Sequence, residues 1–196
     1  GYIPVSQEAI EDSDYDLVGL IADEIADQEL NTKNAEIATR LKTATAHTAV
    51  GLDGLKDVIN TKLKKVFDVK LYASSSMFNA LDKAKDKNGR YLLQDSITSP
   101  SGKSFAGKEV IVLDDKVIGN PAINDPQYVA FIGDAFEFCA LFDRKRASAK
   151  WINHDIYGEL LASFVRFSVS AVDTTAGYYV TYVPSEDNLP APVEGA

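Results

Sequence analysis

The amino-acid sequence predicts an α+β fold, in which helices flank a mixed sheet and long antiparallel strands accompany a long helix. Three observations support this class. A segment from Asp16 to about Lys42 contains no proline and repeats aliphatic residues near helical spacing. A strand followed by a helix is predicted at Val69 and again at Val110. From Ser163 onward, successive side chains alternate in character, as they do in a long strand.

The N-terminal part begins with an extended segment, Tyr2–Ser6, and Ser6 is expected to cap a short helix behind it. Ser13 or Asp14 then caps the long helix, which spans about 40 Å at 1.5 Å per residue. The turns from Asp27 to Asn34 are polar on most faces. This composition is typical of a helix that lies across a surface or against a neighbour rather than in a core of its own.

A loop, a helix and a strand are expected next. Residues Thr43–Gly51 are small and polar, which predicts a loop. Asp53 is expected to cap a helix that continues to about Phe67. The apolar residues at helical spacing in this helix are Leu55, Val58, Ile59, Leu63 and Val66. The β-branched and aromatic residues of Val69–Ala73 predict a strand.

A second short helix follows that strand. Its predicted cap is Ser74–Ser76, and its apolar residues recur at helical spacing as Met77, Phe78, Leu81 and Ala84. The turn Asp86–Gly89 ends the helix, because Asn-Gly readily supplies a positive φ. Residues Ser96–Lys103 are rich in turn formers and predict an exposed loop.

Two apolar regions form the centre of the predicted sheet. The run Val110–Leu113 predicts a strand buried on both faces, which the acidic pair Asp114-Asp115 ends. The runs Tyr128–Ile132 and Phe136–Phe142 are separated by only Gly133–Ala135. A link this short predicts adjacent strands or one bulged strand.

The C-terminal part contains two further strands. Residues Ile156–Ala162 are ambiguous between a strand and a helical turn, and they lead into the alternating strand that reaches Val172. Asp173–Thr175 predicts a turn, and Gly177–Val183 is the last strand, which Pro184 ends. The remaining residues, SEDNLPAPVEGA, are rich in proline and acidic side chains and predict a disordered tail.

The composition is that of a globular protein, with 196 residues of which 45% are hydrophobic. This length accommodates one compact domain or two closely packed ones. The chain contains neither a membrane-spanning apolar stretch nor a signal-peptide layout, which predicts a cytoplasmic protein by default. Its single cysteine, Cys139, lies among aromatic residues and is expected to be a small buried hydrophobe rather than a nucleophile.

The net charge of −9, from 29 acidic and 20 basic residues, argues against tight DNA binding. Nucleic-acid binders neutralise phosphates with clustered basic side chains. The two local basic runs, Lys62–Lys65 and Lys83–Lys87, are expected to be solvated, with a phosphate or the acidic face of a partner as alternatives.

An enzymatic reading has little support in the sequence. The chain has no phosphate-binding glycine loop, no Gly-x-Ser-x-Gly elbow and no His-Glu-x-x-His pair. His47 and His154 are far apart and lie in polar segments. The pair Asp114-Asp115 is compatible with a divalent cation but is explained by a strand-ending turn, and Gly51–Gly54 by helix capping. We therefore predict no catalytic, cofactor-binding or metal residues, with a small acidic enzyme as the alternative.

Four sequence blocks, taken in order, resemble the major capsid proteins of tailed bacteriophages. They are IPVSQEAIEDS, LDKAKDKNGRYLL, AGKEVIVLDD and FDRKR, and the resemblance extends from Ile3 to Pro184. It implies the tailed-phage major capsid fold, with a long spine helix. The implied peripheral domain comprises residues 1–42 and 144–171, and the implied axial domain comprises residues 43–143 and 172–184.

The resemblance also implies a function. A capsid protein of this family assembles as pentamers and hexamers into an icosahedral head shell around phage DNA, which it contacts weakly. Scaffolding or portal proteins are further partners, no membrane is involved, and assembly takes place in the host cytoplasm before the protein resides in the virion. Family members carry an N-terminal arm and an extended loop before the segment that begins here at Tyr2, which indicates a truncated or processed chain. Encapsulins, bacterial compartment shells of the same fold, are the alternative.

The expected functional residues lie at a contact between subunits. Arg144, Lys145 and Arg146 form a basic cluster, and the acidic residues Asp23, Glu24 and Asp27 lie on the long helix. Opposite charges on two surfaces favour their association. We expect these clusters to pair between adjoining subunits, with ordinary solvated charge as the alternative.

Overall fold

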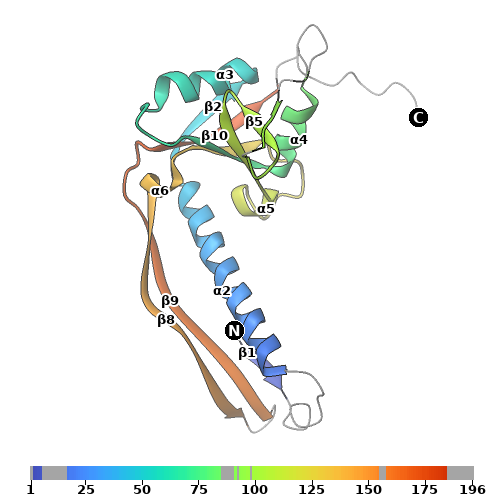
Figure 1. The fold of residues 1–196 in the computed structure, drawn as a ribbon, viewed down its shortest axis with the longest axis vertical. Coiled ribbons are helices and arrows are strands. Elements are labelled where there is room, and N and C mark those ends of the chain that lie inside the picture. Colours follow the sequence, from blue (N-terminus) through green and yellow to red (C-terminus); the bar gives the residue numbers. More distant parts are fainter. Residues whose placement is uncertain are drawn as a thin grey trace, which may run out of the picture. The chain divides into compact units, whose positions relative to one another are not determined.

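The computed structural model describes residues 2–5, 17–84, 91, 93–97, 99–154 and 158–184. The chain divides into two compact units (Figure 1). One contains Gly1–Ile37 and Leu141–Ser170, and is called here the helix-hairpin unit; the other contains Ala38–Ala140 and Ala171–Ala196, and is called the sheet unit. No helix of the described part is long and apolar enough to span a membrane.

The sheet unit is built on a seven-stranded mixed sheet with the strand order β2-β10-β7-β3-β6-β5-β4. The pairs β10–β2 and β3–β6 are parallel, and the other described pairs are antiparallel. The strands are β2 Thr45–Val50, β3 Lys70–Ser74, β4 Gln94–Asp95, β5 Lys103–Phe105, β6 Lys108–Leu113, β7 Val129–Gly133 and β10 Gly177–Val183. The predicted mixed sheet is therefore confirmed.

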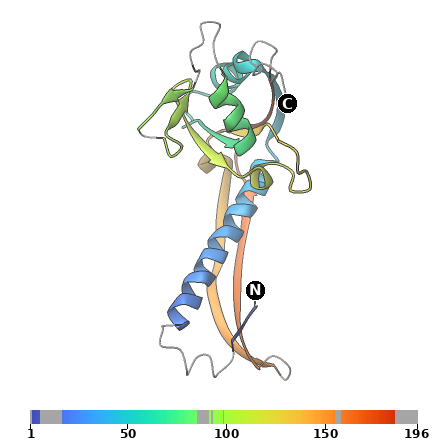
Figure 2. The same cartoon turned by 90° about the vertical axis from the view of Figure 1, so that its right-hand side faces the viewer.

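Short helices accompany this sheet and complete its core. They are α3 Gly51–Asp57, the π-helical turn η1 Val58–Lys62, α4 Ser75–Lys83, α5 Asp115–Ile118 and α6 Ala135–Phe138. Helix α4 contacts β3 and β6 (Figure 2). The core side chains include Leu55, Leu71, Leu81, Val110 and Ile132, all fully buried. Each such side chain stabilises the fold by about 1.5–3 kcal/mol relative to exposure.

Ser74 joins the predicted cap of α4 to the strand beside it. Its Oγ accepts hydrogen bonds from the backbone N–H groups of Met77, at 3.2 Å, and Val129, at 3.3 Å. The same hydroxyl donates to the carbonyl oxygen of Gln127. This buried side chain therefore orients the start of α4 and the start of β7 together.

The predicted loop at Thr43–Gly51 is wrong, because Thr45–Val50 forms strand β2. This strand pairs in parallel with β10, from Thr45 opposite Tyr178 to Val50 opposite Val183. It lies at an edge of the sheet, and most of its side chains are exposed. Small polar residues are tolerated there, because an edge strand needs few apolar side chains.

The helix after β2 is also shorter than predicted and starts earlier. It begins at Gly51, whose φ is 63°, so Asp53 lies inside the first turn rather than at the cap. It ends as a π-helical turn at Lys62, not at Phe67, and Leu63 is already extended. Val66 is 90% exposed and does not belong to the buried face.

The run Phe136–Phe142 is neither a strand adjacent to β7 nor a bulge. The carboxylate of Asp134 accepts from the N–H groups of Phe136, at 3.0 Å, and Glu137, at 3.3 Å, and so caps the short helix α6. The next strand, β8 Cys139–His154, starts only after this helix and belongs to a different sheet. A capped helical turn thus separates two apolar runs that look continuous in sequence.

Two smaller expectations also differ. Strand β6 exists, but Val112 near its carboxyl end is 37% exposed, so the run is not buried on both faces. In the expected exposed loop Ser96–Lys103, Ser99 is buried and both accepts from and donates to the backbone of Val110. The hydroxyl group of Ser99 therefore links this loop to β6 by hydrogen bonds with the backbone of Val110.

The helix-hairpin unit contains most of the long helix and a three-stranded sheet. Helix α2 runs over Leu17–Leu41, which confirms the predicted long helix. The sheet has the order β1-β9-β8, with β1 Tyr2–Val5 antiparallel to β9 Gly158–Ala171. The ambiguous segment before Ser163 is therefore a strand from Gly158. The expected helix after Ser6, the turn at 86–89 and the tail at 185–196 lie outside the described residues.

Helix α2 is held in its unit by an ion-pair network. Lys33 Nζ lies 2.6 Å from Oε1 of Glu29, on the same helix, and 3.3 Å from Oδ2 of Asp143, on β8. The Lys33 side chain is only 17% exposed. The hydrogen bond with Glu29 raises the pKa of Lys33, aided by Asp143 and opposed by partial burial.

Replacing Gly133 with alanine should destabilise the sheet unit. Gly133 has a φ of 157°, and an added Cβ would lie 2.3 Å from the carbonyl oxygen of Ala176. Strain and overpacking together should lower the free energy of unfolding by about 3 kcal/mol, measured by urea denaturation. The control Gly107→Ala, with a φ of 74° and open space, should lose only about 1 kcal/mol. Equal losses for both variants would contradict the steric account.

The Lys33→Met variant should weaken the helix-hairpin unit in a salt-dependent way. Its urea midpoint should fall below that of the wild type at low salt, and the difference should shrink near about 1 M salt. The control Lys56→Met removes a more exposed pair with Asp53, at 3.4 Å, and should change little.

The pH dependence of this difference follows from the raised pKa of Lys33. Its contribution to stability is complete below the ordinary pKa of 10.5 and is lost as the pH rises through the higher folded value. The two midpoints should therefore converge only in strongly alkaline solution. A difference in urea midpoint that depends on neither salt nor pH would indicate that Lys33 acts through packing instead.

Candidate subunit interface

Helix α2 has two distinct faces within the helix-hairpin unit. One carries the partly buried residues of its described side chains, which recur every three or four positions: Ile25, Glu29, Lys33, Glu36 and Ile37. With 3.6 residues per turn these lie on one stripe. The stripe mixes charged and apolar residues, so the described side chains from Asp23 to Ile37 form no continuous apolar face. The pair between Lys33 and Asp143 joins this stripe to β8.

The predicted acidic residues lie on the other face of α2. Asp23, Glu24 and Asp27 are all exposed. At about 100° per residue, their mean direction is opposite to that of the stripe that includes Lys33. Glu24 accepts a hydrogen bond from Gln28 at 3.2 Å, within the same helix. The three carboxylates are therefore exposed to solvent in this structure.

The predicted basic cluster lies in the extended backbone of β8. Residues Arg144, Lys145 and Arg146 fall within Cys139–His154, and their side chains lie outside the described part of the chain. Helix α2 and β8 belong to the same unit. The pairing of this cluster with Asp23, Glu24 and Asp27 stays a prediction.

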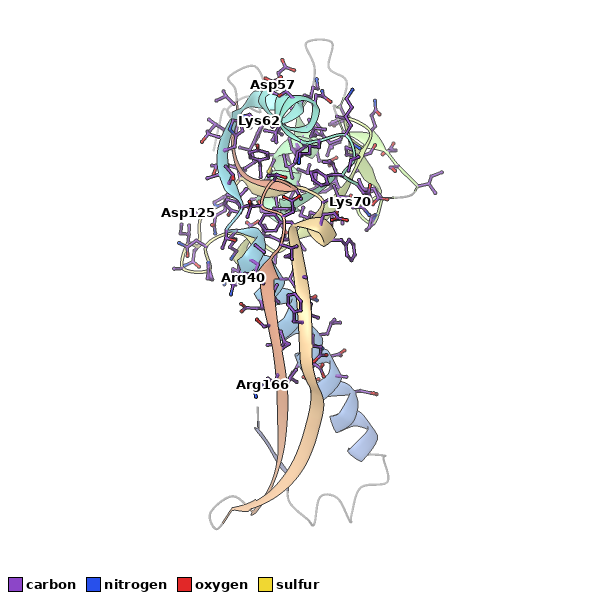
Figure 3. All side chains as sticks on the ribbon, turned by 90° about the vertical axis from the view of Figure 1, so that its left-hand side faces the viewer. Arg40, Asp57, Lys62, Lys70, Asp125 and Arg166 are labelled. Carbon is purple, nitrogen blue, oxygen red and sulfur yellow. The ribbon has the colours of Figure 1, made fainter. Side chains whose placement is uncertain are left out.

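The described part of β8 and β9 also forms a groove that the sequence did not suggest. It has a volume of about 330 Å³ and is lined by Phe142, Asp143, Arg166, Phe167 and Ser168. Arg166 extends from β9 and is exposed (Figure 3). A tertiary groove of this kind has no local sequence signal. The spacing of Glu29 and Lys33, by contrast, is the favourable one for a helical ion pair and was available from sequence.

The residues considered for catalysis or metal binding have structural roles where they are described. Asp114 caps α5, and Asp115 accepts from the N–H and the hydroxyl of Ser76. His47 lies on β2, with its Nδ1 3.5 Å from Lys62 Nζ. Within the described ranges, no group of three His, Cys, Asp or Glu residues is arranged to hold a metal ion.

Cys139 and the basic run at Lys62–Lys65 are likewise structural where they are described. The Cys139 thiol is partly buried and donates to the carbonyl oxygen of Ala135, and burial raises its pKa, which disfavours the nucleophilic thiolate. Lys62 and Lys64 lie 5.9 and 5.8 Å from the ring centroids of Tyr178 and Phe67. These side chains cover neighbouring aromatic rings.

Comparison with solved structures identifies the fold. The chain is similar to the capsid of a native GTA particle, with a TM-score of 0.74 and 16% identity over 93% of this chain and 71% of that one. It is also similar to a Mycobacterium phage Che8 structure, with a TM-score of 0.62 and 10% identity over 92% and 68% of the two chains. The mature capsid of bacteriophage PhiM1 matches with a TM-score of 0.59 and 10% identity over 97% and 71%. Similarity at these identities shows the tailed-phage capsid fold.

Comparison at the level of sequence identifies the family. Curated proteins gave no significant match. A sequence model described as the phage capsid family matches residues 1–173, which is most of the chain. This match favours a phage capsid protein over a bacterial compartment shell or a small acidic enzyme. The chain therefore belongs to the phage capsid family, as a major capsid structural subunit of the virion that associates with copies of itself and is not an enzyme.

Proposed function

We propose that this subunit tiles an icosahedral head shell that encloses phage DNA, with its copies arranged in pentamers and hexamers. The observation that carries this proposal is the charge arrangement of the helix-hairpin unit. Three exposed carboxylates lie on the outward face of α2, and a basic cluster lies in β8. The GTA capsid to which the chain is similar was determined with C5 symmetry, which supports a closed symmetric shell.

The two parts of the subunit take different places in this shell. We assign the axial domain, at the five-fold and six-fold centres, to residues 43–143 and 172–184. The peripheral domain comprises residues 1–42 and 144–171. Support comes from the different construction of the two compact units: one has a broad mixed sheet with a buried core, and the other has a long helix and long strands.

The proposed contact joins Arg144, Lys145 and Arg146 of one copy to Asp23, Glu24 and Asp27 of the next. The acids lie opposite the stripe of α2 that includes Lys33, and Lys33 pairs with β8 of the same copy. The α2 face that carries the acids is therefore turned away from this internal contact. Complementary charge steers subunits together and fixes their register.

The remaining roles follow from the proposed shell. A net charge of −9 suits a container wall, because DNA packed inside must slide and repack without being trapped. DNA contact is weak and non-specific. Scaffolding and portal proteins are the other assembly partners, and the subunits assemble in the host cytoplasm.

Reversing the basic cluster tests the proposed contact. In the full-length capsid protein, Arg144→Glu with Arg146→Glu should abolish particles or misdirect their assembly, since like charges then face each other. Sedimentation and electron microscopy measure the outcome. The control Lys65→Glu with Lys116→Glu makes the same change of net charge at exposed positions of the sheet unit and should leave particles intact. Normal shells from the first variant would reject the contact.

A further inference from the structure

The three-stranded sheet exposes both apolar and charged side chains on its strands β8 and β9. Along β9, Arg166 and Ser168 are exposed, whereas Phe167 is partly buried and Val169 is buried. Phe142 on β8 is 56% exposed although it is a large apolar side chain. The groove described above, with its volume of about 330 Å³, lies among these residues. Water contacts an apolar surface here that an association would bury.

Arg166 adds a positive charge to this groove, and it has no partner within the described part of the chain. Asp143 lines the same groove, but its carboxylate pairs with Lys33 at 3.3 Å. Among the described residues, no ion pair or hydrogen bond involves the Arg166 guanidinium. The groove therefore combines exposed apolar surface at Phe142 with a cation that has no partner among the described residues. Its best occupant is an apolar side chain that has a carboxylate about one turn away on the same element.

The outward face of α2 has this combination. Leu30 is 56% exposed, which is unusual on a helix whose outward face is otherwise polar. It follows Asp27 by three positions and Asp23 by seven, so the three side chains lie on one stripe of the helix. Along the helix axis, Asp27 and Leu30 are about 4.5 Å apart.

We propose that the groove receives Leu30 of α2 from a second copy of this chain, while Asp27 of that copy pairs with Arg166. The inference deepens the proposed shell and rests on it, because it requires copies to meet. The α2 of the same copy does not fill the groove, since its Leu30 is 56% exposed. Arg144–Arg146 directly follow the groove residues Phe142 and Asp143 in the sequence of β8.

The symmetry of this contact has a consequence for assembly. The groove and the Leu30 stripe are different patches, so the contact is heterologous and repeats from one copy to the next. Such contacts close into rings when the rotation between copies permits. An isologous contact, with α2 against α2, would instead stop at a dimer.

Disulfide trapping tests the contact directly in the full-length capsid protein. In a Cys139→Ser background, Leu30→Cys combined with Ser168→Cys should give a ladder of linked chains on a non-reducing gel after oxidation of assembled particles. Each single cysteine variant should stay monomeric on the gel. A disulfide formed within one chain, a dimer from Leu30→Cys alone, or no linkage within intact particles would each overturn the proposal.

Charge substitutions provide a second test of the contact, and this test does not depend on disulfide formation. Arg166→Glu should reduce the particle yield about tenfold or more, the change expected for roughly 1.4 kcal/mol at each contact. Arg166→Gln and Asp27→Asn should each lower the yield, and the double variant should lose less than the two losses combined, because both groups belong to one pair. The matched control, Asp125→Asn, neutralises an exposed acid of the sheet unit and should show no such coupling with Arg166→Gln.

The two proposals fail in different ways. Absence of particles from the wild-type protein, expressed together with its scaffolding and portal partners, would overturn the proposed shell, and the inference with it. Wild-type particles together with fully additive losses from Arg166→Gln and Asp27→Asn would overturn only the contact between Leu30, Asp27 and the groove. Circular dichroism of each variant separates a loss of contact from a loss of fold.

Discussion

An ion-pair network holds the described part of α2, whose side chains from Asp23 to Ile37 form no continuous apolar stripe. The partly buried stripe of α2 places Lys33 between Glu29 and Asp143, at 2.6 and 3.3 Å. Ion pairs are weaker and more easily screened than a buried aliphatic seam. The unit therefore leaves apolar surface, including Leu30 and Phe142, available for contact with other molecules.

The sheet unit is stabilised in the ordinary way. Its central strands contribute fully buried side chains such as Leu71, Val110 and Ile132, and the helices α3 and α4 add Leu55 and Leu81. Backbone polar groups at the element ends are satisfied by Ser74, Ser99 and Asp134. This unit holds a core of its own.

Local periodicity accounts for what the sequence could predict. The long helix, the strand before Ser74, the cap at Ser74 and the last strand all have signals within a few residues, and all are present. Strand β2 was missed because its small polar residues become a strand only through pairing with β10, far along the chain. The prediction for the apolar run at Phe136 was wrong because Asp134 was taken as part of a short link, whereas its carboxylate caps α6 through the N–H groups two and three residues on.

The interface residues divide in the same way. The exposure of Asp23 and Asp27 followed from the polarity of the helix, and the charge of Arg144–Arg146 was visible in the sequence. The groove at Phe142 and Arg166 was not predictable, because it requires the register of β8 against β9. The shape and charge of such a groove exist only in the folded protein, so they cannot be predicted from local sequence.

The position of β10 in the strand order also affects biosynthesis. In the described sheet, β2 borders only β10, which is synthesised after all the other described strands of this sheet. A nascent chain that ends early lacks the strand that joins β2 to β7, so its sheet stays open and β2 stays unpaired. Chains that terminate before β10 therefore cannot complete this sheet, so the strand order makes correct folding depend on complete synthesis of the described region.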